Sequence, residues 1–480
     1  MHRFWRFRWL SGALLLMIGI RADGSLLADE PPPAGKIRIA QRAGEDFASI
    51  QAAIDAAADG ATLLIGPGRY DERLKITRPV KLLGAGPDQT VIGPSADARD
   101  RIEETFEERI KALVEQFKGK PIDGQKVHAA WAELAVAVVK IDGVQGVELR
   151  SLRIVSPGTP RTGGGLSDGF HGIDLSGAGL QMTNCAAVGC LGSGIHATGK
   201  SNLEIDDCLI AGCWSPGIQT KNFAGRLKIA NSDIRNCYHY NVWVGTSDDV
   251  FTIEGCRVSG SAWSGIRFGG RPTIARNAIF ENARAGIYAD GDAAIKQNLI
   301  YKNGVGGVIF WSQNKSVLEG NLLMENGGAD VFANGVCEPT IRRNVFVGGK
   351  VALLFGPVQS AGVSLQPSGK YQVEQNLFWK TDRPLVRRYP ESGQNDAHDD
   401  AIPLAAGAGN QSKDPQVSID SEGQVALAAD SPARQLDFAG ITAATMKSRW
   451  PLTLEERGII PDDGSRDWSK WKMKPALAKQ

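Results

Sequence analysis

Ionisable and aromatic residues recur in the sequence at intervals of 21 to 24 residues, each two positions after a Gly or Asn. The first series is Asp174, His196, Gln219, Trp243, Arg267 and Tyr288. A second series, two positions further on, includes Lys221, Asp290, Trp311 and Asn334. Acids, bases, amides and aromatic rings at one regular spacing suit a long ligand that repeats one chemical unit.

These residue types are suited to removing a proton from a carbon atom next to a carboxylate. β-Elimination or C5 epimerisation of a uronic acid polymer needs a base for that proton. It also needs positive charge that stabilises the enolate-like intermediate. We assign His196 as the candidate base, and Lys221 and Arg267 as the groups that neutralise the carboxylate. Tyr288 would return a proton to carbon or protonate the leaving oxygen.

A segment rich in Asp and His leads into the first of these positions. Residues 167–174 read Ser-Asp-Gly-Phe-His-Gly-Ile-Asp, which brings His171 to the groove edge beside His196. The segment is similar in content to the Asp-Gly-Ile/Phe-Asp-Pro-His motif of mannuronate C5 epimerases. The order of the residues differs, so no role can be transferred residue by residue. His171 and Asp174 are further catalytic candidates.

Aromatic residues also precede several positions of the first series, namely Trp214, Tyr238, His239, Tyr240 and Trp263. Aromatic faces beside polar groups suit sugar rings, which present apolar C–H faces and hydroxyl groups. We therefore expect a substrate-binding groove for a glycan. Its remaining members would be Gln219, Trp243, Asp290, Trp311 and Asn334. A solvated sheet face, or a face covered by loops, is the alternative.

The repeat itself predicts the fold. Each unit contains three short apolar segments of period two, separated by Gly or Asn, which predicts three strands and three turns per unit. Stacking such units buries one continuous core. The predicted fold is an all-β, right-handed parallel β-helix, a three-sheet solenoid with coils of 21–24 residues. A leucine-rich repeat has a similar period, but it supplies one strand per unit.

The coil spacing limits which candidates can act on one sugar. Neighbouring coils lie ~4.8 Å apart, so His196 and Arg267, three coils apart, would be separated by ~14 Å. A compact catalytic set is then either His196 with Lys221, or Arg267 with Tyr288 and Asp290.

Two further residue types follow the same period. Asn277, Asn298, Asn321, Asn344 and Asn376 fall at one position, where Asn tolerates left-handed backbone angles and can hydrogen-bond to its next copy. The cysteines of the central coils form two sets with the same spacing. These are Cys185 with Cys208, and Cys190 with Cys213 and Cys237. We expect them to stack in inner columns, either as buried free thiols or as a disulfide between neighbouring coils.

The chain is expected to fall into four parts. Residues 1–28 have a basic start, an apolar run and a small residue before a polar junction, which predicts a signal peptide; a retained anchor is the alternative. Residues 29–36 would be a linker. Residues 37–392 would form the β-helix, interrupted by a helical insertion at about 95–138, and residues 393–480 a C-terminal extension. No later segment is apolar enough to cross a bilayer.

Helical patterns occur at the start of the solenoid and in the insertion. An apolar stripe from Phe47 to Ala57 predicts a capping helix over about 46–58, which would cover the open first coil. In the insertion, residues of about 99–118 carry an apolar stripe on a charged helix, and a second helical stretch follows near 126–138. This pair would either roof the binding groove or cover a lateral apolar patch.

The start of the solenoid resembles that of the pectin-lyase-like β-helix proteins. The resemblance rests on Phe47-x-x-Ile50-Gln51-x-Ala53-Ile54, Ala61-Thr62-Leu63, Pro67-Gly68-x-Tyr70-x-Glu72 and Leu83-Gly84-Ala85-Gly86. Asp414-Pro415 and Asp430-Ser431-Pro432-Ala433 are similar to the closing segment of many secreted members. The resemblance covers roughly 37–440 and implies the fold and an association with polysaccharides, rather than one reaction.

Other chemistries fit the sequence less well. Hydrolysis would use two carboxylates ~5–10 Å apart, and Asp174 has no acidic neighbour on the next coil. Pectinesterase would need a Gln-Asp-Thr motif one coil before Asp330, where Trp311-Ser-Gln stands instead. Asp396, His398, Asp399 and Asp400 could hold Ca²⁺, although a solvated loop is the alternative. Otherwise no metal site or cofactor is indicated.

The overall charge excludes one class of partner. The chain has 54 basic and 53 acidic residues, which argues against a nucleic-acid-binding face. We therefore expect a secreted or periplasmic protein, monomeric, that acts on a polysaccharide. The first hypothesis is a lyase or C5 epimerase of a uronic acid polymer. The second is a non-catalytic glycan-binding or cell-envelope protein that keeps the fold without the chemistry.

Overall fold

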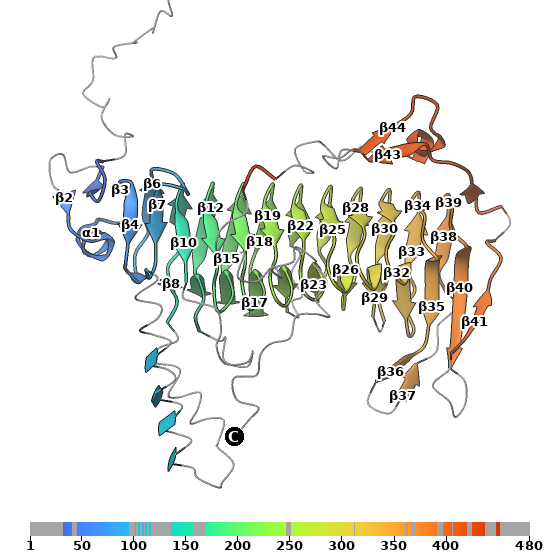
Figure 1. Ribbon diagram of the computed structural model, residues 1–480, viewed down its shortest axis with the longest axis horizontal. Coiled ribbons are helices and arrows are strands. Elements are labelled where there is room, and N and C mark those ends of the chain that lie inside the picture. Colours follow the sequence, from blue (N-terminus) through green and yellow to red (C-terminus); the bar gives the residue numbers. More distant parts are fainter. Residues whose placement is uncertain are drawn as a thin grey trace, which may run out of the picture.

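The computed structural model shows a long solenoid of parallel strands (Figure 1). It describes residues 32–40, 46–95, 136–156, 169–245, 251–311, 313–360, 363–365, 370–390, 397–405, 407–419, 425–436 and 448–451, with helical positions between 101 and 116. The described strands form three long sheets, A, B and C, and each turn of the solenoid contributes one strand to C, then A, then B. The predicted all-β solenoid with three sheets is therefore confirmed.

Sheet A has 14 described strands, and all but its first two pairings are parallel. In spatial order they are β2 (Asp46–Phe47), β1 (Ile37–Ile39), β3 (Ala61–Ile65), β6 (Val80–Gly84), β9 (Val147–Arg150), β12 (Gly179–Thr183), β15 (Asn202–Asp206), β18 (Leu227–Ala230), β21 (Thr252–Glu254), β24 (Thr273–Ala275), β27 (Ala294–Lys296), β30 (Val317–Glu319), β33 (Thr340–Arg342) and β38 (Gln372–Glu374).

Sheet B has 13 described strands, all paired in parallel. They are β4 (Gly68–Tyr70), β7 (Thr90–Ile92), β10 (Arg153–Val155), β13 (Ala186–Val188), β16 (Leu209–Ala211), β19 (Asp233–Arg235), β22 (Arg257–Ser259), β25 (Ala278–Phe280), β28 (Leu299–Tyr301), β31 (Leu322–Met324), β34 (Val345–Val347), β39 (Leu377–Trp379) and β42 (Gln411–Ser412).

Sheet C also has 13 described strands and ends in an antiparallel pairing. They are β5 (Leu74–Ile76), β8 (Val139–Asp142), β11 (Ile173–Ser176), β14 (Ile195–Gly199), β17 (Ile218–Phe223), β20 (Val242–Val244), β23 (Ile266–Phe268), β26 (Ala285–Ala289), β29 (Gly306–Phe310), β32 (Ala329–Asn334), β35 (Val351–Gly356), β40 (Arg383–Pro390) and β41 (Ala397–Ala401).

The core is a stack of identical positions from successive turns. Ile173, Ile195 and Ile218 are paired in register and are fully buried, as alternation along each strand predicts. The same alternation turns the intervening residue outward. Sequence periodicity alone therefore predicts which side chains of sheet C point away from the core.

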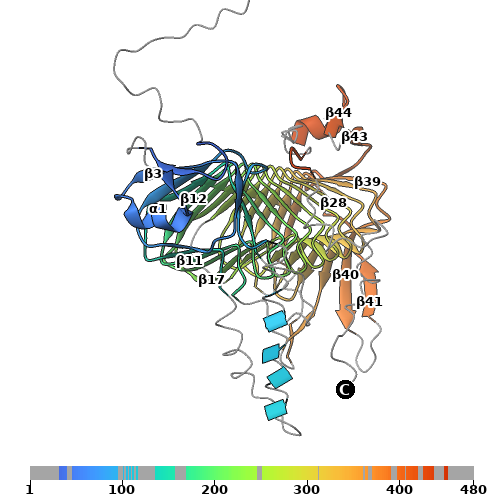
Figure 2. The same cartoon turned by 60° about the vertical axis from the view of Figure 1, so that its left-hand side comes forward.

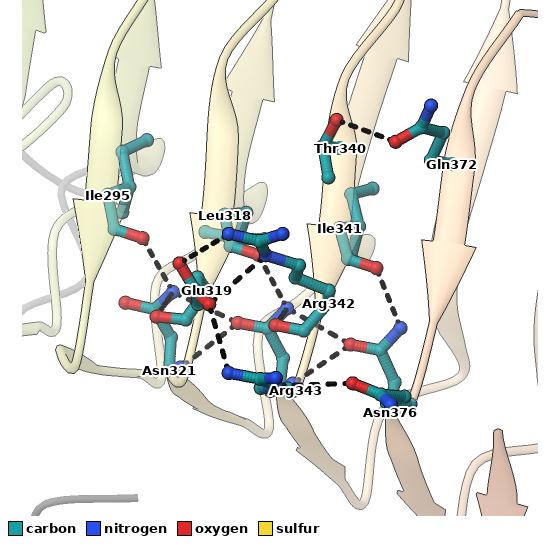
Figure 3. A network of polar contacts seen from close by, with 12 residues as sticks. Ile295, Leu318, Glu319, Asn321, Thr340, Ile341, Arg342, Arg343, Gln372 and Asn376 are labelled. Carbon is teal, nitrogen blue, oxygen red and sulfur yellow. Dashed lines mark hydrogen bonds and ion pairs between the residues drawn. The ribbon is translucent and has the colours of Figure 1, made fainter. Parts of the chain in front are cut away.

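Two buried columns of polar side chains line the turns on either side of sheet B. The first contains Cys185, Cys208, Ser232 and Cys256 and continues as Asn277, Asn298, Asn321, Asn344, Asn376 and Asn410. Each amide from Asn277 onward donates to the oxygen of the next, which confirms the predicted stacking (Figure 3). The second column runs from Cys190, Cys213 and Cys237 through Ser261 to Asn282, Asn303 and Asn326.

These two columns test what we expected of the cysteines and the asparagines. All seven cysteines are buried free thiols, so the alternative of a disulfide between coils is excluded. The asparagines of the first column do not have left-handed backbone angles, contrary to our expectation. The residue before each has them instead, as at Arg276, Gln297 and Arg343 with φ of 54–56°. The turn thereby points the Asn side chain inward, where the amide can hydrogen-bond.

The N-terminal end of the solenoid is covered as expected, by a shorter helix than predicted. Helix α1 (Ile50–Ala56) begins after Ser49, whose hydroxyl accepts from the Ala52 N–H. Phe47 belongs to β2, so the predicted helix start at about 46 is wrong. Figure 2 shows α1 beside β3 at this end of the solenoid.

Only part of the predicted insertion lies within the described residues. Positions 101, 104–105, 108–109, 111–112 and 115–116 are helical and extend away from the solenoid near β8 (Figures 1 and 2). Of the second predicted helical stretch, near 126–138, residues 126–135 lie outside the described residues, as do residues 1–31, and residues 136–138 are not helical. None of the described helices is long and apolar enough to cross a membrane.

The chain after residue 392, where we placed the end of the solenoid, still contributes strands. Strands β41 and β42 pair with β40 and β39. Two hairpins, β36 (Val358–Ser360) with β37 (Val363–Leu365) and β43 (Val417–Ile419) with β44 (Val425–Leu427), and the 3-10 helix η1 (Pro432–Leu436) complete the described elements. Ala433 packs with Leu299, Leu322 and Val345 on the outer face of sheet B.

Candidate functional site on sheet C

The first polar series forms one straight row on the outer face of sheet C. Asp174 pairs in register with His196, and the register continues strand by strand through Gln219, Trp243, Arg267 and Tyr288. We call these six residues the outer strip. The second series begins beside it, since Ser176, Thr198 and Lys221 are also in register.

His196 and Asp174 form a hydrogen-bonded pair on neighbouring strands. The Nδ1 atom of His196 lies 2.9 Å from Oδ1 of Asp174. Burial alone would raise the pKa of Asp174, but the hydrogen bond from His196 and the nearby charge of Lys140 outweigh it and lower the pKa below its usual value. An ionised carboxylate fixes the proton on Nδ1 of His196, so Nε2 is left as the basic atom.

His171 supports the His196–Asp174 pair by packing against the His196 ring. Its ring stacks on that of His196, with centroids 4.4 Å apart and planes inclined by 17°. The backbone N–H of Ser193 donates to Nδ1 of His171 at 3.0 Å, and that of Gly169 approaches Nε2 at 3.3 Å. An Nδ1 atom that accepts a hydrogen bond carries a lone pair, so the His171 ring is neutral. His171 is 5% exposed, which suits a positioning residue rather than a group that touches substrate.

Gln219, predicted to bind substrate, is 7% exposed and is held from within the protein. Its Oε1 atom accepts from the Ser193 hydroxyl at 2.7 Å. Ser193 therefore connects Gln219 to His171 through its side chain and its backbone. The sequence analysis missed Ser193, because it lies in a turn rather than in a strand column.

Arg267 is the centre of a second cluster, three strand steps from His196. Its Nε atom donates to Asp290 and its Nη1 atom to the Tyr240 hydroxyl, both at 2.9 Å. Burial would lower the pKa of Arg267, but the hydrogen bonds to Tyr240 and Asp290 raise it. Since Asp290 already balances the guanidinium, Arg267 is a weaker partner for a substrate carboxylate than the sequence predicted.

Tyr288 does not fit the acid role that we assigned to it. Burial and the nearby Asp290 raise its pKa to about 12, so the phenol holds its proton tightly. It also lies four strand steps from His196, or ~19 Å. Tyr288 can donate a hydrogen bond to a ligand, but it lies too far from His196 for both side chains to contact one sugar unit.

The predicted rim aromatics form a continuous contact chain beside the outer strip. The chain runs through Trp214, Tyr238, His239, Trp263, Tyr240 and Trp243, with successive ring centroids 5.4–5.8 Å apart. Trp214 and Tyr240 are each 7% exposed, so they support the partly exposed rings of Trp243 and Trp263. Burial lowers the pKa of His239.

The outer strip has clear ends. Toward the N-terminus it continues as the exposed Lys140, which pairs with Asp174, and as the exposed Lys75, which pairs with Lys140; the sequence analysis missed both. Beyond Tyr288 the same register holds Ile309, Phe332 and Leu354. Trp311 extends the strip a little further, because its ring centroid lies 5.9 Å from that of Tyr288. The polar face therefore runs from Lys75 to Trp311, further toward the N-terminus than the predicted track, which began at Asp174, and Asn334 lies one turn beyond Trp311.

The structure provides no metal centre among the residues it describes. No group of three or more His, Cys, Asp or Glu side chains in that part of the chain could hold a metal ion. The acidic cluster that we considered for Ca²⁺, at residues 396–400, has side chains that lie outside the described ones.

Comparisons with known proteins concern the whole solenoid. A family model described as the right handed beta helix region matches residues 139–250 and 240–386. Among solved structures, the chain is similar to the A-module of a mannuronan C-5 epimerase from Azotobacter vinelandii, with 14% identity, a TM-score of 0.38 and coverage of 70% of this chain and 83% of that one.

Two further structures give similar values. A periplasmic alginate epimerase has 13% identity, a TM-score of 0.41 and coverage of 79% of this chain and 96% of its own. A surface adhesin of Streptococcus pneumoniae has 11% identity, a TM-score of 0.35 and coverage of 73% and 88%. A search among curated proteins finds no match. Identities this low concern the fold alone.

Proposed function

Since this chain belongs to the right-handed β-helix family, we propose that its outer strip binds an acidic polysaccharide and that His196 removes the C5 proton of a uronic acid unit. The observation that carries the proposal is the Asp174–His196 hydrogen bond, which leaves Nε2 as the basic atom of a His196 side chain that is 16% exposed. The predicted signal peptide would place the protein outside the cytoplasm, secreted or periplasmic. As a separate part of the proposal, the protein acts as a monomer.

The reaction starts with transfer of the C5 proton to Nε2 of His196. Asp174 stabilises the imidazolium that forms, as an ionised carboxylate on Nδ1 does in other acid–base sites. The electron pair of the C5–H bond passes into the neighbouring carboxylate, where positive charge stabilises it. Lys140 and Lys221, both exposed on the same face, are the cations closest to this position in the strand register.

Two outcomes follow from the same intermediate. In elimination, the C4–O bond breaks, a C4–C5 double bond forms, and the imidazolium returns its proton to the leaving oxygen. In epimerisation, C5 instead takes a proton from solvent on its opposite face. Both outcomes use the same base, so the strip supports a lyase and a C5 epimerase alike.

The aromatic part of the strip would hold the rest of the polymer. Trp243 and Tyr288 are partly exposed, and strands ~4.8 Å apart match a chain of sugar rings closely enough for successive contacts. Arg267 still has an Nη2 group that neither Asp290 nor Tyr240 uses in the two bonds described above. It can donate to a hydroxyl or carboxylate of a distant sugar unit.

The test is His196→Ala on a panel of acidic and neutral polysaccharides, read as ultraviolet absorbance of unsaturated uronates and as deuterium incorporation at C5. We expect turnover to fall about 10³-fold in His196→Ala, as for loss of a general base. We expect about 10²-fold in Asp174→Asn, which acts through His196. Polymer binding should persist in both. Lys228→Ala, on the exposed face of β18, is the matched control and should keep full activity.

A second candidate function is glycan binding without chemistry. The charge balance between Arg267 and Asp290 favours it, because a neutralised cation beside exposed rings suits a neutral sugar. The same panel separates the two. Wild-type protein that binds a polymer, but shows neither unsaturated products nor exchange at C5, would contradict the enzyme and support the binding module.

A further inference from the structure

A short segment near the end of the chain lies on the outer face of sheet B, on the side away from the outer strip. Ser448–Pro451 contacts strands more than 200 residues earlier in the sequence. Figure 1 shows the segment near β19, on the same side of the solenoid as β43. Its Trp450 is 7% exposed and packs on an apolar patch of β10, β13 and β16. The patch consists of Val155, Ala186, Val188, Leu209 and Ala211.

Arg235 on β19 holds the backbone of this segment. Its Nη1 atom donates to the Ser448 hydroxyl at 2.8 Å and to the Trp450 carbonyl at 3.2 Å, and its Nη2 atom donates to the Pro451 carbonyl at 2.8 Å. The same Nη1 atom also donates to Oδ2 of Asp233 at 2.6 Å, which fixes the guanidinium to its own strand. Arg235 is only 6% exposed, so a buried charge is used here to bind carbonyl oxygens.

The side chain of Arg449 adds polar contacts of its own. Its Nε atom forms an ion pair with Asp207 at 2.6 Å, and Nη2 donates to the Asn184 side chain at 2.8 Å. Its guanidinium also lies 4.2 Å from the centroid of the Trp450 ring. Ser448, Arg449 and Trp450 are thus each recognised by a different feature of the solenoid.

We propose that the outer face of sheet B from β10 to β19 is a peptide-binding site that recognises the side chains of the sequence Ser-Arg-Trp, and that Ser448–Pro451 occupies it as an intramolecular ligand. Every group that forms the site belongs to the strands of the solenoid or their turns. The apolar patch and the Asp233–Arg235 pair are therefore fixed by the stacked coils and do not require the segment for their formation. The inference is independent of the chemistry on sheet C.

Covalent attachment gives the segment a high effective concentration, so it should exclude the same peptide added from solution. The test uses full-length Trp450→Ala, which removes the anchor and empties the site. The probe is a fluorescent peptide of residues 446–453, followed by anisotropy. We expect this variant to bind the peptide at least tenfold more tightly than the wild type. Asp207→Asn in the same background should weaken binding several-fold.

Two controls keep the proposal falsifiable. A peptide with Ala at the Trp450 position should not bind the emptied site, and full-length Arg449→Ala serves if Trp450→Ala fails to fold, because the Arg449 side chain is 49% exposed. Equal binding of the peptide to wild type and to both variants would overturn the proposal. Equal binding of the Ala peptide would do the same.

Discussion

The two halves of the solenoid share one backbone but differ on both sides of their sheets. From β11 to β26 the outer face of sheet C carries the polar strip, and the first inner column contains mostly thiols. From β27 onward the outer positions are apolar, as at Ile309 and Phe332, and the inner columns are asparagine ladders.

This difference indicates that the residues that stabilise the coils are separate from the residues that form the candidate site. The C-terminal half satisfies its turns with buried amides, so each coil is bonded to the next through side chains as well as through strands. The N-terminal half lacks most of these amide contacts. Both halves carry a docked segment on the outer face of sheet B, around Trp450 in the N-terminal half and around Ala433 in the C-terminal half. The half that presents the candidate site therefore depends more on strand pairing and apolar packing than on buried amide contacts.

The largest effect should come from breaking the asparagine ladder. Asn321 donates to the carbonyls of Ile295 and Glu319 and to Asn344, and it accepts from the backbone and side chain of Asn298 (Figure 3). Asn321→Leu would leave several buried groups unpaired, so we expect the free energy of unfolding to fall by ~4 kcal/mol. Urea unfolding followed by circular dichroism measures this loss.

The matched change in the N-terminal half is Cys208→Ala, at the same column position. The thiol donates a weak hydrogen bond, at 3.2 Å, to the Asp206 carbonyl. We expect a loss of only about 1 kcal/mol, mostly from packing. Equal losses for the two variants would mean that the ladders do not distinguish the halves.

A pH-dependent effect should appear at the end of the second asparagine column. Asp330 is fully buried; it accepts from Asn326 at 2.8 Å, while its other oxygen has no hydrogen-bond partner. Burial raises the pKa of Asp330 to about 7, although the hydrogen bonds from Asn326 oppose the shift. The native state therefore binds more protons than the unfolded state between about pH 4 and 7.

Stability that depends on this proton is lost as the pH rises through that window and then levels off above about pH 7. Asp330→Asn keeps the acceptor for Asn326 and removes the titration. We expect the variant to gain on the wild type as the pH rises from 4 to 8, by about 4 kcal/mol in all, since the shift is about three pKa units at ~1.4 kcal/mol each. A difference that stays constant over this range, measured from urea midpoints, would show that Asp330 does not titrate in the native protein.

Much of this arrangement could be predicted from the sequence because it is local and repeated. Alternation along a strand decides which side chains face outward, and the 21–24-residue period places Asp174 beside His196 and stacks Asn298 on Asn321. Neither inference needs a contact that the repeat does not itself impose. The fold, the strip and the ladders all follow from these two rules.

Other features could not be predicted because they depend on contacts outside the period. Arg235 and Trp450 are 215 residues apart, and nothing in either sequence context indicates the other. The burial of Gln219 depends on Ser193 in a turn, and the pairing of Arg267 with Tyr240 joins a strand to a rim residue. Such pairs set the charge balance of a site. Residue types alone therefore overestimated how strongly Arg267 would attract a substrate carboxylate.

The smallest expected effect is a change in polymer affinity at the end of the polar half, near Trp311. Trp311 is partly exposed and contacts Tyr288, whereas Asn334 lies one turn further among apolar outer positions. If a polymer follows the strip to its end, Trp311→Ala removes one ring contact worth about 1 kcal/mol and weakens binding of long chains roughly fivefold. Asn334→Ala should change the affinity less than twofold. Isothermal titration with oligosaccharides of increasing length distinguishes the cases, because a short oligosaccharide held near His196 cannot reach Trp311. Equal effects of the two substitutions would place the boundary between the halves beyond Trp311.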